Sequence, residues 1–321
     1  MAEKSIAQGA RGRFDLDSPR VRAALPLIGL AVMLALFTVL TKGQILTPNN
    51  LKLQLSQMYM LMIASIGVFF VITMGCLDFS QGSLMGVACI VFCYVSKTNI
   101  VLGILAGIAT GALIGAVNGW LHVYLQIPSF IVTMSTQYLF RGVVQFLTTK
   151  SPVMANMAIA KLNNMPFMIG ITLACLFVMY FFFRFTAFGA NLKAIGAGER
   201  GARFAGIRVR RTKFWVYVLA GAITGFAAFV NAIKVLSVTS TGGNQLETQI
   251  LIGLVLGGMP ISGGAKVRFS NIVVGVLMYR FLATGLVMIG LTSQMQQLIQ
   301  GIVFVVMVTL FSDRKSIAVI K

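Results

Sequence analysis

Long apolar runs alternate with short polar segments along almost the whole chain. A helix needs about 20 apolar residues to cross the hydrocarbon core of a bilayer. The pattern therefore predicts an all-α integral membrane protein with about ten transmembrane helices. The third and eighth runs are short and adjoin Gly- and Pro-rich breaks, which indicates broken or re-entrant helices. The expected spans are 23–40, 56–75, 84–97, 100–121, 129–148, 167–184, 214–233, 248–258, 269–290 and 295–311.

Composition supports this interpretation, and the charges give it an orientation. Hydrophobic residues make up 58% of the chain and charged residues 10%, with a mean hydropathy of +0.90. The net charge is +19, but the bases gather in a few loops, as topology signals do, and do not favour nucleic-acid binding. Eighteen Lys and Arg fall on one predicted side and six Lys on the other. The positive-inside rule then predicts that both termini are cytosolic.

The same topology gives one transmembrane domain, 23–312, between a cytosolic amino-terminal segment, 1–22, and a cytosolic tail, 313–321. The first apolar run is long, and no small-residue cleavage site follows it, so it is expected to remain as an uncleaved span. The longest polar interruption is 185–213, which carries seven of the cytosolic bases. This loop is expected to meet a soluble cytosolic partner, and the alternative is a basic loop lying on anionic lipid.

Glycine recurs every four residues in the fourth expected span. On a helix these residues form one flat stripe, which lets a second helix approach closely in a membrane. The stripe predicts a tight helix–helix contact without identifying the other helix. Its members are Gly103, Gly107, Gly111, Gly115 and Gly119.

Two acids lie at breaks between apolar runs. Asp78 precedes the third span and Glu247 precedes the eighth. An acid at membrane depth is costly unless it has a partner or faces water. Asp78 with Ser80 is expected either to cap the following helix or to take part in a pathway or gate. Glu247 is expected in a similar role or at the outer face, and Arg141 and Arg280 are candidate countercharges.

Uncharged amides also run through several spans. They suit a cavity that offers hydrogen bonds to a neutral, hydroxylated solute, and hydrogen bonding between helices is the alternative. The candidate residues of the pathway or gate are Asp78, Ser80, Asn118, Gln137, Asn231 and Glu247.

Little in the sequence favours an enzyme, a resident cofactor or a metal site. The four cysteines lie in or beside apolar runs without metal-ligand neighbours in the sequence, so they are expected to be buried free thiols. The segment 196–201 fits G-x-G-x-x-G but lacks the surrounding βαβ unit that a dinucleotide site needs. The segment 257–266 lacks the Lys and the Ser or Thr of a P-loop.

Several motifs together resemble the permease subunits of bacterial ABC importers for simple sugars, of the ribose type. The family pattern GGIDLSVGS resembles GCLDFSQGS at 75–83, and PPFIVTLGT resembles PSFIVTMST at 128–136. The family's loop with AIGGNEEAARLSGI resembles FGANLKAIGAGERGARFAGI at 188–207. Further matches are the NGWL of 118–121, Arg141-Gly142, Gly243, Glu247, Gly257-Gly258 and Gly263-Gly264.

This resemblance implies a multi-pass permease in a bacterial inner membrane, paired with a second copy or a paralogous permease. It also implies a cytosolic ATPase that holds the ATP and Mg²⁺, and an extracytoplasmic sugar-binding protein. In the family a short cytosolic permease helix docks on the ATPase, a role that here falls on 194–207. The residues so assigned are Ala194, Gly198, Glu199, Arg200, Ala202, Arg203, Gly206 and Ile207.

The chain departs from the family pattern at Gly198-Glu199-Arg200, at Gly201, at Leu251-Ile252 and after Gly264. These differences leave the solute open among a monosaccharide such as ribose, a branched-chain amino acid, a nucleoside and a sugar-derived signal. A solitary ion-coupled transporter is the alternative of a different class. Such a transporter needs membrane carboxylates and a two-half repeat. The sequence has few carboxylates in its apolar runs and no clear internal repeat.

Overall fold

The computed structural model describes residues 19–311, with side chains from Ala24 onward. The predicted tail 313–321 and most of the segment 1–22 lie outside this range, and Pro19 already begins the first helix. The α-helices are α1 (Pro19–Leu40), α2 (Pro48–Thr73), α3 (Gln81–Ser96), α4 (Ile100–Val123), α5 (Ser129–Thr148), α6 (Met165–Phe185), α7 (Ala187–Ala197), α8 (Glu199–Phe204), α9 (Val209–Val235), α10 (Leu246–Leu256), α11 (Ser270–Met288) and α12 (Ser293–Phe311).

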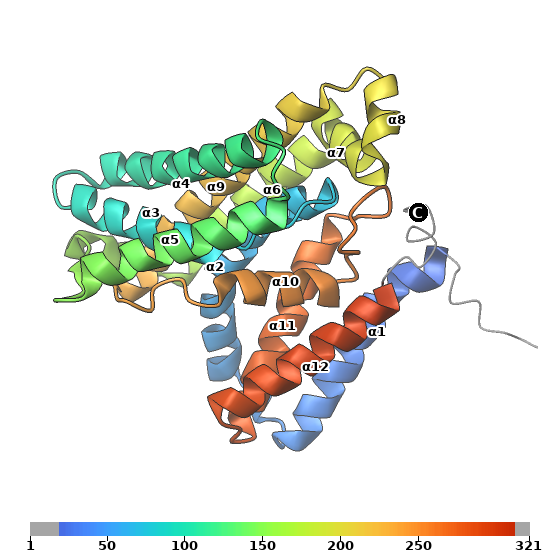
Figure 1. The fold of residues 1–321 in the computed structure, drawn as a ribbon. Helices are drawn as coiled ribbons and strands as arrows, with labels where there is room; N and C mark the ends of the chain where they lie inside the picture. The colour runs from blue at the N-terminus through green and yellow to red at the C-terminus, as the bar shows by residue number, and fades with distance from the viewer. Residues whose placement is uncertain (1–18, 312–321) are drawn as a thin grey trace, which may run out of the picture.

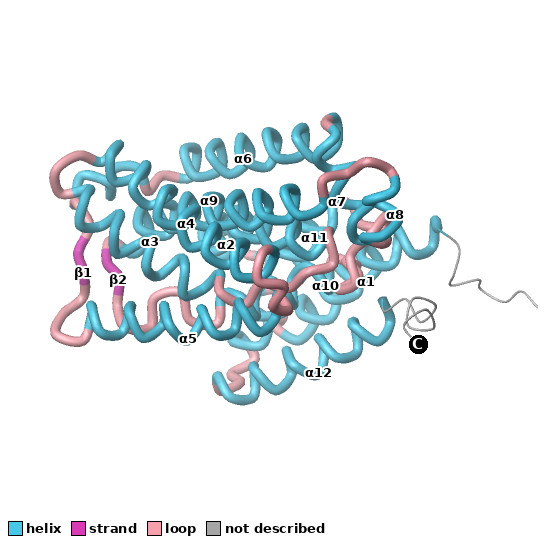
Figure 2. The backbone as a smooth tube through the Cα atoms, turned by 45° about the horizontal axis from the view of Figure 1, so that its top comes forward, coloured by secondary structure: helices cyan, strands magenta, loops and turns pink. Residues whose placement is uncertain are grey.

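Short elements complete the described part of the chain. They are two 3₁₀ turns, η1 (Gln44–Leu46) and η2 (Met157–Leu162), and two strands, β1 (Val153–Met154) and β2 (Ser237–Val238). The strands pair antiparallel, with Val153 opposite Val238, and join the loops that follow α5 and α9. The apolar pattern did not indicate this sheet. Figure 2 shows it at one end of the bundle, with α7 and α8 at the other.

The helices form two groups (Figure 1). One group holds α3, α4, α5 and α9, and the other holds α1, α11 and α12. Helices α2 and α10 lie between the groups and contact both. The centre is α2, whose residues from Leu61 to Thr73 are all buried. By contrast, α12 has no buried residue and presents apolar side chains along its length, as a helix facing lipid or another membrane protein would.

Within the described part of the chain, six helices are long and apolar enough to span a bilayer by length and composition: α2, α4, α6, α9, α11 and α12. Most of α1 (Ala24–Leu40), α3 and α10 form shorter apolar helices. The expected short third and eighth spans correspond to α3 and α10. The all-α class is confirmed, and the total of about ten crossings stays a prediction.

Four glycines of the α4 stripe, from Gly107 to Gly119, lie against α9, which is the helix that the sequence left unidentified, and Gly103 lies against Ser96 at the end of α3. A Cβ added at Gly111 would lie 2.1 Å from the carbonyl oxygen of Gly221, and one at Gly115 would lie 2.2 Å from that of Tyr217. Gly225 makes the reciprocal approach to Gly107, whose oxygen would be 2.4 Å from a Cβ there. At these positions the two backbones touch directly, and any side chain would separate them. This contact fixes α9 beside α3 and α4, where the polar groups described next are found.

Candidate functional site

The non-helical segment between α2 and α3 is organised by one buried carboxylate. Asp78 is 1% exposed. Its Oδ1 accepts hydrogen bonds from the Ser80 backbone N–H at 2.9 Å and from the Ser80 hydroxyl at 2.6 Å. Its Oδ2 accepts from the Gln81 amide at 2.6 Å. Three donors compensate the cost of burying this carboxyl group, and together they hold the turn that starts α3.

The network continues into two neighbouring helices. Asn118 on α4 donates from Nδ2 to the Ser80 hydroxyl oxygen at 2.8 Å, and the Thr224 hydroxyl on α9 donates to Gln81 Oε1. Ser80, Gln81, Asn118 and Thr224 are all fully buried. Three of the predicted pathway residues, Asp78, Ser80 and Asn118, are thus brought together. Gln81 directly follows Ser80, so its closeness to Asp78 could have been predicted from the sequence. Thr224 lies in an apolar run, where no neighbouring residue indicates a link to Asp78.

The second acid organises the break before α10. Glu247 lies in the first turn of α10 and is 5% exposed, so its carboxylate is buried within the protein, and its position relative to the outer face stays a prediction. Gln137 on α5 donates from Nε2 to Glu247 Oε1 at 2.8 Å. Arg141, one turn further along α5, donates to the carbonyl oxygens of Gly242 at 2.7 Å and Gly243 at 3.0 Å. Helix α5 therefore clamps the segment that leads into α10.

The two predicted countercharges differ from each other. Arg141 binds the two carbonyl groups and interacts electrostatically with the Glu247 carboxylate, although the two side chains do not lie within ion-pair distance. Arg280 on α11 donates to the Gln57 side-chain oxygen at 3.1 Å and to the Gln57 carbonyl at 2.8 Å. The countercharge role is therefore wrong for Arg280, which joins α11 to α2. A guanidinium group has five N–H donors and can be satisfied by neutral oxygens, so charge alone does not identify its partner.

The two breaks meet at a pair of glycines. A Cβ on Gly243 would lie 2.0 Å from the Gly82 carbonyl oxygen, and a Cβ on Gly82 would lie 2.3 Å from that of Gly243. The same Cβ on Gly82 would lie 2.0 Å from Glu247 Oε2. No side chain fits between these segments. The start of α3 and the loop before α10 are therefore in direct backbone contact, which places the Asp78 and Glu247 segments side by side.

A polar-lined cavity of about 210 Å³ adjoins this contact. Asn231 lies on its wall and not in the Asp78 network, so the predicted pathway residues divide between a network and a cavity. Ser237, Thr239 and Thr241 supply hydroxyl groups, and apolar residues such as Met60 and Met85 complete the wall. Hydroxyl and amide groups beside an apolar surface can bind a small, neutral, hydroxylated molecule. Two further amides, those of Asn244 and Gln249, also line the cavity.

The opposite end of the bundle carries the predicted ATPase-coupling segment, and its helix α7 is anchored by a glycine. A Cβ on Gly196 would lie 2.1 Å from the Thr73 carbonyl oxygen at the end of α2 and 2.6 Å from the Gly264 backbone nitrogen. Leu192 and Ile195 are buried beneath the same helix. Helix α7 therefore touches both the segment that leads to Asp78 and the loop between α10 and α11.

The segment 194–207 does not form one continuous helix, because it divides at Gly198. Ala194 belongs to α7, while Glu199, Arg200, Ala202 and Arg203 belong to α8. Gly206, with φ +81°, and Ile207 form the turn that leads to α9. A glycine between two short helices lets the chain change direction at little steric cost. Gly198 is also the C-cap of α7, and its N–H donates to the carbonyls of Ala194 and Ile195.

Charge and exposure distinguish the two sides of α8. Ala202 faces the body of the protein and is buried, and Glu199 binds Lys213 on α9 and lies 3.8 Å from Arg203. Arg200 and Arg203 are exposed. Phe204 is 93% exposed. An aromatic ring so exposed is a feature of docking surfaces. Phe204 was not among the predicted coupling residues, which were chosen for their charge or small size.

The α7–α8 end is strongly basic. Burial, together with the nearby Arg184 and Arg268, lowers the pKa of Lys193 from its ordinary value. The Lys193 ammonium lies 5.1 Å from the centre of the Phe183 ring. Repulsion among these cations favours an anionic partner at this end of the molecule.

Cysteine placement differs in one respect from the sequence expectation. All four cysteines are free thiols. Cys76 Sγ lies 3.5 Å from Nε2 of His122, although the two residues are far apart in the chain. Among the described residues, no group of three or more His, Cys, Asp or Glu is arranged to hold a metal ion.

Comparison with known proteins identifies the family. Residues 50–308 match the family described as "Branched-chain amino acid transport system / permease component". The ribose import permease protein of Bacillus subtilis (strain 168) is 32% identical over 303 residues, covering 91% of this chain and 93% of the relative. The xylose transport system permease protein of Haemophilus influenzae (strain ATCC 51907 / DSM 11121 / KW20 / Rd) is 25% identical, covering 94% and 99%. The L-arabinose transport system permease protein of Escherichia coli (strain K12) is 29% identical, covering 74% of each chain.

No solved structure matches this chain significantly. The family match covers all of α3 to α11 and most of α2 and α12. It includes the Asp78 and Glu247 breaks and the segment with α7 and α8, so the resemblance drawn from the motifs is confirmed. The chain belongs to the family of membrane permease components of transport systems that also includes the bacterial ribose, xylose and arabinose permeases.

Proposed function

We propose that this chain is the translocation subunit of an ATP-driven importer for a simple sugar, with ribose as the first candidate. The observation that carries the proposal is the meeting of two interrupted segments at Gly82 and Gly243, beside a cavity lined by uncharged hydroxyl and amide groups. Non-helical backbone at membrane depth is tolerated where it is buried or lines a solute path. The three sugar permeases among its relatives support the same class of solute.

The lining of the cavity favours a sugar over an amino acid. The described residues around it carry no charged side chain. A zwitterionic amino acid would lose the hydration of both its charged groups on entering such a site, and that loss is costly without charged partners. A neutral sugar needs only hydroxyl and amide partners. The family description nevertheless names branched-chain amino acids, so leucine is the comparison solute in the test below.

The proposal assigns ATP hydrolysis to a separate subunit. Helix α8 and the exposed Phe204 would dock on a cytosolic ATPase, which alone would bind ATP and Mg²⁺. A second permease, identical or paralogous, would complete the pathway, and a sugar-binding protein would deliver the solute from the other side of a bacterial inner membrane. The basic α7–α8 end is cytosolic in this arrangement, in agreement with the positive-inside rule.

Reconstitution with partners tests the proposal. The permease is co-expressed with the ATPase and binding protein encoded beside it, purified, and placed in liposomes that contain ATP. We expect ATP-dependent uptake of radiolabelled ribose, xylose or arabinose and none of leucine. Uptake of leucine and of none of the sugars would show that the solute is an amino acid and not a sugar. Uptake driven by an ion gradient without any ATPase would refute the importer assignment itself.

A further inference from the structure

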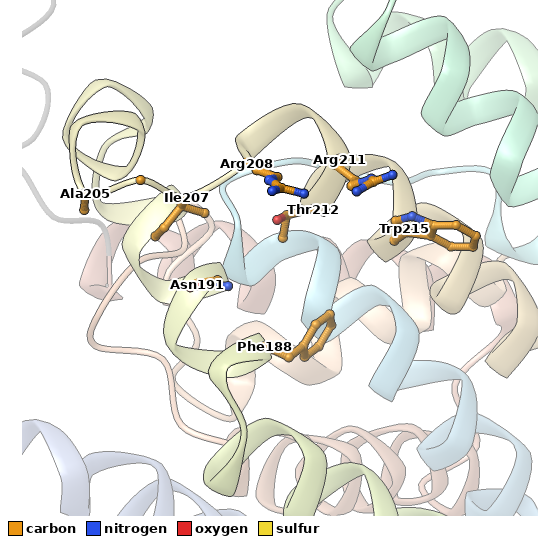
Figure 3. A pocket seen from close by; sticks show the side chains of 9 residues that line it. Phe188, Asn191, Ala205, Ile207, Arg208, Arg211, Thr212 and Trp215 are labelled. Carbon is orange, nitrogen blue, oxygen red and sulfur yellow. The ribbon is translucent and has the colours of Figure 1, made fainter.

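A groove of about 540 Å³ lies between α7, the turn after α8 and the first turns of α9. Figure 3 shows Arg208, Arg211 and Thr212 gathered on its α9 side, with Asn191 and Phe188 on its α7 side. Trp215 closes one edge, and Ala205, Gly206 and Ile207 supply the turn. None of its lining residues belongs to the Asp78 or Glu247 segments, and its composition differs from that of the sugar cavity.

The groove is built for an anion. Its described lining holds two guanidinium groups, a hydroxyl and an amide, but no acid. Arg208 and Arg211 have no carboxylate within ion-pair distance among residues 24–311, because Glu199, the acid of this region, is bound to Lys213 and lies beside Arg203. Guanidinium groups bind phosphate oxygens through paired, charge-assisted hydrogen bonds. Two free arginines beside a hydroxyl group therefore favour a phosphate group.

The surroundings of the groove indicate where that phosphate comes from. Trp215 is 57% exposed and Phe185, at the end of α6, is 65% exposed. The ring of Phe188, which lines the groove, lies 4.6 Å centre to centre from that of Phe182. Exposed aromatic rings at the ends of spans are typical of the bilayer interface, at the depth of the lipid headgroups. The groove thus combines cationic donors with an exposed aromatic band next to them.

The geometry points to a binding site for the phosphate headgroup of an anionic phospholipid, with its acyl chains against the aromatic band of α6 and α9. Basic pockets beside transmembrane helices on the cytoplasmic side bind such headgroups. The occupant would restrain the turn at Gly206 and Ile207, which joins α8 to α9. A bound lipid would therefore hold the proposed ATPase-docking helix at a fixed height above the membrane.

Tryptophan quenching measures this binding directly. The chain has two tryptophans, Trp120 and Trp215, so a Trp120→Phe background leaves Trp215 as the reporter. The protein is reconstituted in phosphatidylcholine with increasing fractions of brominated phosphatidylglycerol, and in a parallel series with brominated phosphatidylcholine. We expect half-maximal quenching at an about 25-fold lower fraction of the anionic lipid, since each of the two arginines near the membrane surface contributes roughly a fivefold preference.

Matched variants identify the groups responsible. The double variant Arg208→Gln/Arg211→Gln is expected to lose the preference and to be quenched equally by both lipids. Arg184→Gln removes one exposed charge from the same end of the molecule but lies outside this groove and outside the adjoining one that Arg208 and Arg211 also line, and it is expected to keep most of the preference. Excess inorganic phosphate is expected to displace the lipid only weakly, because it lacks acyl chains. Far-ultraviolet circular dichroism checks that each variant remains folded.

Four results would overturn the inference. Equal quenching by both lipids in the parent protein would show that no anionic lipid is selected. An unchanged preference in the double variant would place the selection elsewhere. Complete displacement by inorganic phosphate would identify a soluble anion as the occupant. Protection of Trp215 only when the purified ATPase is added, with no lipid preference, would assign the groove to protein docking instead.

Discussion

Replacing Gly196 with alanine tests whether α7 transmits movement to the body of the protein. The new Cβ would lie 2.1 Å from the Thr73 carbonyl oxygen and 2.6 Å from the Gly264 nitrogen, where ordinary contacts begin near 3.4 Å. Both neighbours are backbone atoms, so rotation of a side chain cannot relieve the overlap. Overpacking of this kind costs about 1–3 kcal/mol. If this cost disfavours the packed position of α7, it reduces the population of protein with α7 packed against Thr73 and Gly264 by about 5- to 150-fold.

The assay compares transport with ATP hydrolysis in the same liposomes. We expect Gly196→Ala to lower ATP-driven uptake much more than it lowers ATP hydrolysis by the complex, since the ATPase would still dock on α8. The control is Gly201→Ala in α8, where a Cβ meets no atom within 4 Å and the helix gains about 1 kcal/mol of propensity. That variant is expected to transport normally.

Two outcomes would refute this reasoning. Equal uptake by Gly196→Ala and Gly201→Ala, with equal melting temperatures, would show that the contact is relaxed at no cost. A parallel loss of uptake and of ATP hydrolysis in Gly196→Ala would show that the glycine serves ATPase docking and not transmission to α2 and the loop after α10.

Three further predictions concern other contacts. Glu199→Arg places a second cation beside Lys213 and should abolish co-purification of the ATPase, while Glu199→Gln should retain it, because the Gln side-chain oxygen can still accept a hydrogen bond from the buried Lys213; equal recovery would contradict this. Asp78→Asn should lower the free energy of unfolding by about 1–3 kcal/mol, since its amide would face a donor such as Gln81; an unchanged melting temperature in detergent would contradict it. Gly111→Ala should force α4 and α9 apart and cost about 1–3 kcal/mol, and thermal unfolding that matches the parent would disprove the close contact.

The apolar runs located the helices well because lipid imposes the same requirement on every span. They underestimated helix length at polar ends. Helix α2 begins at Pro48, eight residues before the expected span, with proline in its first turn where no backbone donor is needed. Helix α9 begins at Val209, and its first five residues, which precede the expected span, include three bases. Hydropathy reports what lipid accepts, whereas helix ends are set by backbone hydrogen bonding.

The candidate site was predictable where chemistry was locally unusual. Asp78 was identified because an acid at a break in apolar sequence needs a partner, and two partners, Ser80 and Gln81, are close in the chain. The pairing of Gln137 with Glu247 joins residues 110 positions apart, and no local pattern encodes such a contact. Arg280 was predicted to pair with an acid, but it donates hydrogen bonds to the neutral Gln57, which is also far away in the chain.

The coupling segment shows a different limit. Its small and charged residues predicted a helix that fits a groove, and the composition was compatible with one helix or two. The division at Gly198 depends on how α7 is held against Thr73 and Gly264, and these contacts come from distant parts of the chain. The exposed Phe204 resembled any other aromatic residue of a membrane protein until its surroundings were known.

The contact between Gly82 and Gly243 has a consequence for how this sequence can vary. Enlarging one member of a side-chain pair is often compensated by shrinking the other, but here each residue meets the carbonyl oxygen of the other. Neither can be made smaller, so no second change within the pair can rescue the first. In a saturation library selected for transport, both positions should accept glycine alone, and double variants at the pair should be as inactive as either single one. The backbone contact between the two interrupted segments therefore requires glycine at both positions.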